Sequence, residues 1–432
     1  MPHTRKWFTV VAFALLPVRA PAAIVEQSGD LLSQVVQIRN NMPGSSSEGF
    51  VKPTATDLQR WRGLITTFVA GDYQQASDLV ASNFPSYQLI HFTDTGLSNQ
   101  TYYLLRESFP VTNGWGTVVV RPDFERDLCI ESPHPVFDIN TDTEGADIFR
   151  RTGARFFILA GTHRCANVEH SPCDGTTTAC GDGAYHVSDP AHFVNATFQV
   201  THETLVAGQP QLYTFNLHGN SSTSCEDLFL SNGRLAGPAH PILFNLKTNL
   251  LAQGGLTVAI AGVDASTCTL TGGDNVQGRF SNGSASPCSQ AAATTTGYFI
   301  HIEQRRVVRD NVSEYAKLIH AITTAVPLAD TDGDGQSNAA EHQAGTSPTN
   351  SASFFGVTGI VREDNDTRVT WMTGIGKTNA LERTAGVAGS FATNNFAAIF
   401  TVTNTVGSVT NYLDMSAATN VPSQYYRIRL VP

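Results

Sequence analysis

The sequence predicts a mixed α/β domain, built on an open sheet with flanking helices, followed by a small all-β domain. Between residues 87 and 326, short apolar runs of strand character alternate with stretches whose apolar residues recur at helical spacing. After residue 353, Val, Thr, Phe and Tyr recur in short alternating runs. The first pattern is typical of an α/β domain, and the second is typical of a small β-sandwich.

Length and charge limit the classes of protein to which the chain can belong. With 432 residues it is long for a single core, so two or three domains are expected. Hydrophobic residues make up 41% and charged residues 15%, as in ordinary globular proteins. The net charge of −10 argues against nucleic acids and anionic membrane surfaces as partners.

Residues 1–23 have the features of a secretory signal peptide. Arg5 and Lys6 precede an apolar run at residues 7–18, and residues 20–23 offer small-residue cleavage sites. The run is shorter than the ~20 residues of a membrane-spanning helix, and no later stretch reaches that length. We therefore expect a soluble protein that is secreted or periplasmic. The alternative is an uncleaved anchor.

The seven cysteines of an exported chain imply disulfides, with one cysteine left unpaired. Cys129 lies inside an apolar strand and is expected to be a buried free thiol. Cys225 is a candidate partner for the first of two local groups. These groups are Cys165, Cys173 and Cys180, and Cys268 with Cys288.

Residues 24–86 are expected to be mostly helical. Residues 57–68 and 73–81 carry apolar side chains at helical spacing, and Gly71-Asp72 separates them. The region shows no residues that point to chemistry. We therefore expect it to form a packing or substrate-capping layer.

From Tyr87 the apolar period changes to two, and residues 87–326 are assigned to the α/β domain. Strands are predicted at residues 87–92, 102–105, 116–121, 128–130, 154–160, 211–217, 241–244, 256–260 and 298–303. Three helices are predicted. The first begins near Asp142 and Glu144, which are expected to cap it, and the other two lie at residues 190–205 and 311–323. A Cys-bearing insertion at 166–189 and a low-complexity loop at 269–296 interrupt the alternation.

The central unit of this domain is residues 131–164. An apolar strand runs into Pro133-His134 and an acidic turn that holds Asp138. A helical stretch and a second apolar strand follow, and this strand delivers His163-Arg164. An open α/β sheet presents an active site in this way, with polar residues where its strands end.

Three strand ends carry residues suited to metal or acid–base chemistry. Two imidazoles and one carboxylate, with a fourth position open to water, make a catalytic zinc site. The metal lowers the pKa of its bound water to ~7, and a further carboxylate can then take the proton. The predicted zinc ligands are His134, Asp138 and His218, and the predicted general base is Glu303.

Each of these residues also has a structural alternative. A histidine that follows a proline at a strand end, such as His134, can be purely structural. Glu303 can serve as an ion-pair partner of the neighbouring Arg305 or Arg306. Arg164 suits a substrate carboxylate, which a guanidinium binds bidentately, but it can instead form an internal ion pair.

Residues 115–326 resemble the N-formylglutamate amidohydrolase group of the wider zinc-carboxypeptidase-like fold, which includes phage poly-γ-glutamate hydrolases. The motifs that carry the resemblance occur in the order of that group. They are Ser132-Pro133-His134, Thr162-His163-Arg164, Asp189-Pro190-Ala191-His192, Asn216-Leu217-His218-Gly219 and Ile302-Glu303-Gln304-Arg305. The resemblance implies that His134, Asp138 and His218 bind zinc. It also implies that Glu303 is the base and that Arg164 binds the substrate's carboxylate.

The chain departs from this group in three places. Pro133-His134-Pro135-Val136 stands where the group commonly has Pro-His-Ser-Gly, and Cys165-Ala166-Asn167 follows the arginine in place of an Asp-rich segment. Asp138 does not have the His-x-x-Glu spacing of carboxypeptidases, so Glu144 is a rival third ligand. These departures leave the fold prediction in place but argue against N-formylglutamate itself as the substrate.

Residues 327–352 are predicted to form a calcium-binding linker. Three aspartates on alternate positions precede Gly335, and Glu341 closes a loop of twelve positions. The predicted calcium ligands are Asp330, Asp332, Asp334, Gln336 and Glu341, and Asn338 fits the ninth position. The segment resembles the aspartate-rich calcium linkers of secreted multidomain proteins, which implies a structural role.

Residues 353–432 are expected to form an accessory domain. The alternating runs at residues 368–372, 398–403 and 424–430 favour a small β-sandwich, and the region carries no His/Asp/Glu cluster. Attachment to a surface is the role that we expect for it.

The sequence therefore predicts an exported zinc-dependent amidase or carboxypeptidase-like hydrolase. Its expected substrates are N-acyl amino acids, peptides or poly-γ-glutamate-like chains that carry a carboxylate. The alternative is a non-catalytic secreted or surface protein that reuses the hydrolase fold, whose metal ligands would not converge. A third hypothesis is a structural zinc in the insertion, against which export and disulfide formation argue. Its ligands would be drawn from Cys165, His170, Cys173, Cys180 and His186.

Overall fold

The computed structural model describes residues 22–97, 99–234, 238–386, 395–403, 405–407, 409–419 and 423–431. Residues 1–21, which make up nearly all of the predicted signal segment, lie outside the described residues. No helix within the described ranges combines the length and the apolar character needed to cross a bilayer.

The large domain is built on one mixed sheet of ten strands among the described residues, in the order β1-β2-β3-β4-β6-β5-β7-β10-β8-β9. The strands are β1 (Val25–Gly29), β2 (Tyr87–Asp94), β3 (Gln100–Glu107), β4 (Thr117–Val120), β5 (Arg126–Ser132), β6 (Ala154–Leu159), β7 (Tyr213–Asn220), β8 (Leu228–Ser231), β9 (Val258–Ile260) and β10 (Phe299–Arg305). The four central strands β6, β5, β7 and β10 run parallel, and β4 and β8 flank them antiparallel. The carboxyl ends of the four parallel strands therefore meet at one edge.

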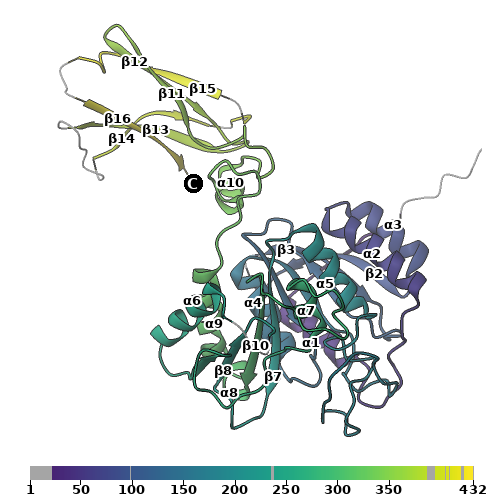
Figure 1. The fold of residues 1–432 in the computed structure, drawn as a ribbon. Helices are drawn as coiled ribbons and strands as arrows, with labels where there is room; N and C mark the ends of the chain where they lie inside the picture. The colour runs from purple at the N-terminus through teal and green to yellow at the C-terminus, as the bar shows by residue number, and fades with distance from the viewer. Residues whose placement is uncertain are drawn as a thin grey trace, which may run out of the picture.

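Helices cover both faces of this sheet, as Figure 1 shows. The helices of the large domain are α1 (Leu31–Asn40), α2 (Ala55–Val69), α3 (Tyr73–Asn83), α4 (Thr141–Thr152), α5 (Thr197–Gly208), α6 (Pro241–Ala252), α7 (Val276–Ser281), α8 (Arg306–Arg309) and α9 (Val312–Ala325). One core lies between the sheet and α1, α4, α6 and α9, and the other lies between the sheet and α2, α3 and α5. Along β5, Leu128 and Ile130 enter the first core and Cys129 enters the second, because successive strand residues point to opposite faces.

The helix ends follow from local sequence. Thr54 caps α2 and forms a reciprocal capping box with Asp57, and Asn311 caps α9. The residue at the cap position of α4 is Asn140, in a left-handed conformation with φ 72°. Asp142 and Glu144, which were expected to cap α4, lie instead in its first turn.

The mixed α/β class is confirmed, but several element predictions were wrong. Residues 241–244, predicted as a strand, begin α6, with Pro241 at its first turn and Ile242, Leu243, Leu246 and Leu250 buried. The helix predicted at 190–205 begins only at Thr197, because residues 190–196 form turns. Strand β1 lies in the region expected to be helical and pairs with β2. Helix α7 lies inside the predicted loop 269–296.

The C-terminal residues form two antiparallel sheets, beyond α10 (Asn338–Ala344) in Figure 1. The sheets are β11-β12-β15 and β14-β13-β16. Their strands are β11 (Val357–Glu363), β12 (Asp366–Met372), β13 (Thr378–Gly386), β14 (Ala397–Val402), β15 (Val409–Asp414) and β16 (Ser423–Val431). Val369 and Trp371 from one sheet share a core with Leu381 from the other, so the predicted β-sandwich is confirmed.

Three disulfides join Cys165 with Cys180, Cys173 with Cys288, and Cys225 with Cys268. The suggested grouping holds for Cys165 and Cys180, but Cys173 pairs with Cys288 of the other group, and Cys225 pairs with Cys268 and not with the first group. Cys129 is the buried free thiol that was expected, and burial raises the pKa of this thiol well above its usual value. The three cysteines of the third hypothesis, Cys165, Cys173 and Cys180, are all disulfide-bonded, so none of them is a zinc thiolate.

Candidate metal centre

The candidate metal centre lies at the carboxyl edge of the parallel strands. His134 and Asp138 belong to the loop between β5 and α4, and His218 lies near the end of β7. In the parallel pairing of β7 and β10, His218 lies opposite Glu303. The sheet therefore brings residues from three separate strand ends to one place.

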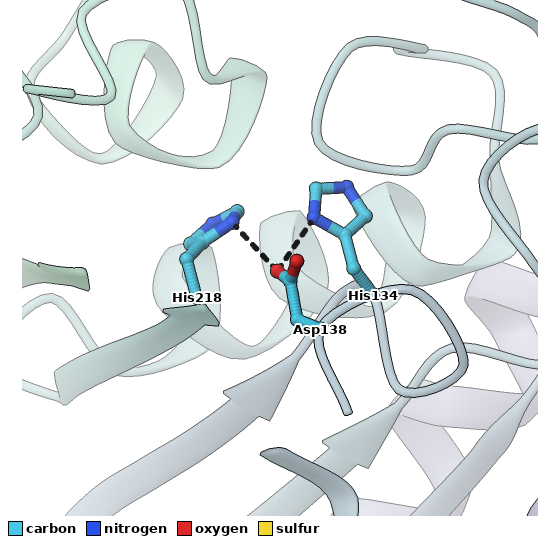
Figure 2. Close-up of side chains that lie close together, drawn as sticks. All are labelled: His134, Asp138 and His218. Atoms are coloured by element: carbon cyan, nitrogen blue, oxygen red, sulfur yellow. Dashed lines mark hydrogen bonds and ion pairs between the residues drawn. The ribbon is translucent and has the colours of Figure 1, made fainter. Parts of the chain in front are cut away.

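Figure 2 shows the two imidazoles converging on the carboxylate of Asp138. Nδ1 of His134 lies 3.2 Å from Oδ2 of Asp138, and Nδ1 of His218 lies 3.7 Å from the same oxygen. One ligand atom from each of the three residues lies within 4.8 Å of the others. Their exposed fractions are 1%, 2% and 6%, so the group is nearly enclosed.

This donor set fits a zinc ion. Zinc binds imidazole nitrogen and carboxylate oxygen at about 2.0–2.2 Å, so tetrahedral ligand atoms lie about 3.4 Å apart. The separations of 3.2 and 3.7 Å bracket that value. Two histidines and one carboxylate leave a fourth position for water or substrate.

Hydrogen bonds on the far side of each ring select the tautomer that such a site requires. Nε2 of His134 lies 2.8 Å from Oδ1 of Asp189, and Nε2 of His218 is hydrogen-bonded to Oδ1 of Asn216. Asn216 in turn donates through Nδ2 to Oε2 of Glu131 at 2.8 Å, which fixes the orientation of its amide. With a metal bound, each Nε2 would therefore carry the proton and each Nδ1 would offer its lone pair to the ion, in place of its contact with Asp138.

The electrostatics of the three ligands have clear physical causes. Burial alone would raise the pKa of Asp138, but hydrogen bonds from His134 and His218 hold it far below its usual value. Burial lowers the pKa of His218. The pKa of His134 is raised in spite of burial and of Arg164, because Asp189 and Asp138 favour its charged form.

Glu303 lies beside His134, Asp138 and His218, and its burial and pKa suit a residue that accepts a proton. The residue is 7% exposed, and burial followed by the nearby charge of Asp138 raises its pKa to about 8. Oε1 lies 3.6 Å from Nε2 of His301, and Oε2 is buried with no hydrogen-bond partner among the described residues. His218, His301 and Glu303 form a second group with ligand atoms within 4.8 Å, so His218 belongs to both.

Arg164 is held by an internal ion pair, which was one of the two alternatives. Its Nε and Nη2 lie 2.8 and 2.5 Å from Oδ2 of Asp189, and its guanidinium carbon lies 5.3 Å from the centre of the Phe137 ring. Asp189 thus links Arg164 to His134. Arg164 also lines the cavity described next, and its bonds to Asp189 do not involve Nη1.

A cavity of about 870 Å³ opens over the metal group. His134, His218 and Glu303 line it together with Arg164. The opposite wall comes from residues 174–185 of the insertion and from residues 269–279. Both segments were expected to be irregular, and both lie beside the predicted site.

Glu144, the rival third ligand, is not a member of the metal-capable groups of the described chain. Its Oε2 accepts a hydrogen bond from Nε2 of Gln304 at 2.9 Å, and burial raises its pKa to about 8. Between the two candidates, Asp138 is the carboxylate that lies with the imidazoles.

Sequence reasoning missed Asp189 and Asn216 as site residues. Asn216 carried a usable signal, because it precedes His218 by two residues on a strand and so shares its face. Asp189 carried none beyond its place in a motif of the resemblance, because the fold of the insertion brings it to His134.

The predicted calcium loop also brings its carboxylates together. Ligand atoms of Asp330, Asp332 and Asp334 lie within 4.8 Å of one another. Burial and the nearby charges of Asp332 and Asp334 raise the pKa of Glu341. Oδ2 of Asp332, Oδ2 of Asp334 and Oε2 of Glu341 are buried without hydrogen-bond partners among the described residues. The side chain of Gln336, the other predicted ligand, instead bonds the backbone of Phe355.

Comparisons with known proteins add little. No protein-family model and no curated protein matches the chain. Among solved structures, a metallo-carboxypeptidase from Burkholderia cenocepacia matches 60% of this chain and 66% of its own, with TM-score 0.29 and 10% identity. A metallo-carboxypeptidase from Pseudomonas aeruginosa, in complex with (2-guanidinoethylmercapto)succinic acid, matches 52% and 60%, with TM-score 0.24 and 12% identity.

A third solved structure is the succinylglutamate desuccinylase from Chromobacterium violaceum. It matches 55% of this chain and 74% of its own, with TM-score 0.27 and 12% identity. The matched part is less than two thirds of both metallo-carboxypeptidases. TM-scores of 0.24 to 0.29 are too low to carry a conclusion about this chain.

Proposed function

We propose that the chain is an exported zinc-dependent hydrolase of amide bonds, acting on N-acyl amino acids, peptides or poly-γ-glutamate-like chains. The observation that supports this most strongly is the group of His134, Asp138 and His218, whose two imidazoles line one cavity together with Glu303. The three disulfides are compatible with export. The non-catalytic alternative expects ligands that do not converge, so their convergence favours the enzyme.

The residues around the centre have separate roles in this proposal. A zinc ion held by His134, Asp138 and His218 would lower the pKa of a bound water to ~7 and polarise the amide carbonyl. Glu303 would accept the proton of the attacking water and return it to the leaving nitrogen. Its raised pKa of about 8 suits both steps near neutral pH.

Arg164 would hold the carboxylate of the substrate in the cavity. Asp189 occupies Nε and Nη2, which leaves Nη1 for the substrate. Because Asp189 also accepts from His134, the residue that positions the arginine positions a metal ligand as well. The distance from the bound carboxylate to the cleaved bond is thereby coupled to the metal.

Elemental analysis of the purified full-length protein tests this function. His134→Ala and His218→Ala should each lose about one zinc per chain, because two ligands rarely hold a catalytic zinc. His320→Ala, on an exposed position of α9, is the matched control and should keep its zinc. Wild-type protein without zinc, or variants with zinc contents equal to that of the control, would contradict the proposal.

We further propose that residues 330–341 bind Ca²⁺ and stiffen the connection to the β-sandwich. The support is the set of three buried carboxylate oxygens without partners, on Asp332, Asp334 and Glu341. Uncompensated buried carboxylates are costly, and a hard divalent cation is the ligand that offsets the cost. We assign the sandwich an accessory role, with attachment to a surface as the role to test.

A further inference from the structure

The insertion at residues 166–189 forms a hairpin-like wall beside the cavity. Ser171 donates its backbone N–H to the carbonyl of Tyr185 at 2.7 Å, and Val187 donates to the carbonyl of Glu169 at 2.9 Å. These bonds place His170 opposite His186 in an antiparallel bridge. The disulfides Cys165–Cys180 and Cys173–Cys288 tie the same segment to its own base and to the second loop.

The side chains of the two paired histidines meet at one carboxylate. Nε2 of His170 lies 3.1 Å from Oδ2 of Asp182, and Nε2 of His186 lies 2.8 Å from the same oxygen. The two rings are stacked, with centroids 5.8 Å apart and planes 21° from parallel. One ligand atom from each residue lies within 4.8 Å of the others.

We propose that His170, Asp182 and His186 form a second transition-metal site, with Zn²⁺ as its expected ion. Two imidazole nitrogens and one carboxylate oxygen are a zinc donor set, whereas calcium and magnesium prefer oxygen ligands alone. The same donor types, at comparable separations, form the candidate catalytic centre. A fourth position, filled by water, faces the solvent because His170 is 60% exposed.

This site has a structural role that the three disulfides do not supply. A metal would cross-link the two sides of the insertion near its base, since His170 and His186 belong to opposite sides. Tyr185, next to His186, stacks on His192 and donates its hydroxyl to Asp274 at 2.8 Å, and it lines the cavity. Fixing His186 therefore fixes the wall that faces the substrate.

Zinc stoichiometry tests the site separately from the catalytic centre. Full-length protein is dialysed against micromolar free Zn²⁺, with millimolar Ca²⁺ present to occupy the acidic loop, and bound zinc is measured by elemental analysis. We expect about two zinc ions per chain in wild type and about one each in His170→Ala, Asp182→Asn and His134→Ala. The double variant His134→Ala/His170→Ala should bind almost none.

Controls keep the two sites distinguishable. His170 is exposed, so its replacement should leave the far-ultraviolet circular dichroism unchanged, and His320→Ala should bind as much zinc as wild type. Zinc contents of His170→Ala and Asp182→Asn that both equal wild type would overturn the second site. If His134→Ala alone keeps full zinc while His170→Ala loses one, the second site stands and the proposed catalytic site fails.

Discussion

Asn216 lies two residues before His218 on β7, and its side-chain Oδ1 accepts a hydrogen bond from Nε2 of His218. Because Nδ2 of Asn216 donates to Glu131, the amide cannot turn without breaking a second buried bond. Glu131 is itself held by Nδ1 of His202 at 2.6 Å. A buried chain of side chains thus sets which nitrogen of His218 faces Asp138.

The first prediction concerns Asn216 as a positioning residue. Asn216→Leu removes the acceptor for Nε2 of His218, so the ring can rotate or change tautomer. We expect zinc affinity to fall by about 10- to 100-fold, which is the usual effect of removing the partner of a metal-bound histidine. Competition with a chromophoric chelator measures it. Asn245→Leu, on an exposed position of α6, is the matched control.

A purely packing role for Asn216 makes a different prediction. It would lower the melting temperature but leave the zinc affinity of the folded protein unchanged. Asn216→Ser keeps a hydroxyl that can accept from His218 through a bridging water. Recovery of part of the affinity in this variant supports positioning, and equal losses in both variants count against it.

The second prediction separates metal binding from chemistry. Glu303→Gln keeps the shape of the side chain but removes the proton acceptor. Hydrolysis of a peptide or N-acyl amino acid substrate should fall by about 10²- to 10⁴-fold in kcat, the range for loss of general base catalysis. Zinc content should stay at the wild-type level. An active Glu303→Gln enzyme would show that another group takes the proton.

Part of the site could be predicted from sequence because strand ends are local features. His134, Asp138 and His218 each follow or end an apolar run, and parallel strands bring their carboxyl ends to one edge. Asp189 lies in an irregular segment whose path depends on long-range disulfides such as Cys173–Cys288. No periodicity encodes such a path, so its contact with His134 appears only in the folded chain.

The helices and strands that were predicted wrongly also have local causes. Pro241 to Phe244 form a short apolar run, which periodicity alone cannot assign to a strand or a helix. The burial of Leu243, Leu246 and Leu250 decides for α6, because their spacing of three and four residues matches one helix face. Strand β1 was missed because Val25 to Gly29 are largely exposed at the sheet edge and carry no apolar alternation.

The third prediction links Glu144 to stability. Burial raises the pKa of Glu144 to about 8 from the ordinary 4.5, so the folded state binds a proton that the unfolded state releases. The resulting stabilisation is complete below pH 4.5 and is lost as the pH rises to about 8, by at most about 1.4 kcal/mol per unit. Glu144→Gln is neutral throughout and should be progressively more stable than wild type as the pH rises through this range.

Urea unfolding of wild type and Glu144→Gln at pH 5 and pH 8.5 measures the difference. The comparison uses the change in free energy of unfolding between the two proteins, so that other titrating groups cancel. Glu363→Gln, whose carboxylate bonds the exposed Arg368, is the control. A difference between wild type and Glu144→Gln that does not change with pH would show that Glu144 is ionised in the folded protein.

The fourth prediction concerns the acidic loop. Asp332 and Glu341 each hold a carboxylate oxygen that is buried without a partner among the described residues. Calorimetric titration of the full chain with Ca²⁺ should release heat, and Asp332→Ala and Glu341→Gln should each abolish most of it, since each removes a ligand. Asp364→Ala, on an exposed turn of the β-sandwich, should bind calcium as wild type does.

Because the loop precedes the sandwich, calcium should also protect residues 327–352 from proteolysis in wild type and not in Asp332→Ala. Equal heats of calcium binding in wild type and Asp332→Ala would mean that the three aspartates only stabilise the turn, through the hydrogen bonds that their side chains accept from backbone N–H groups.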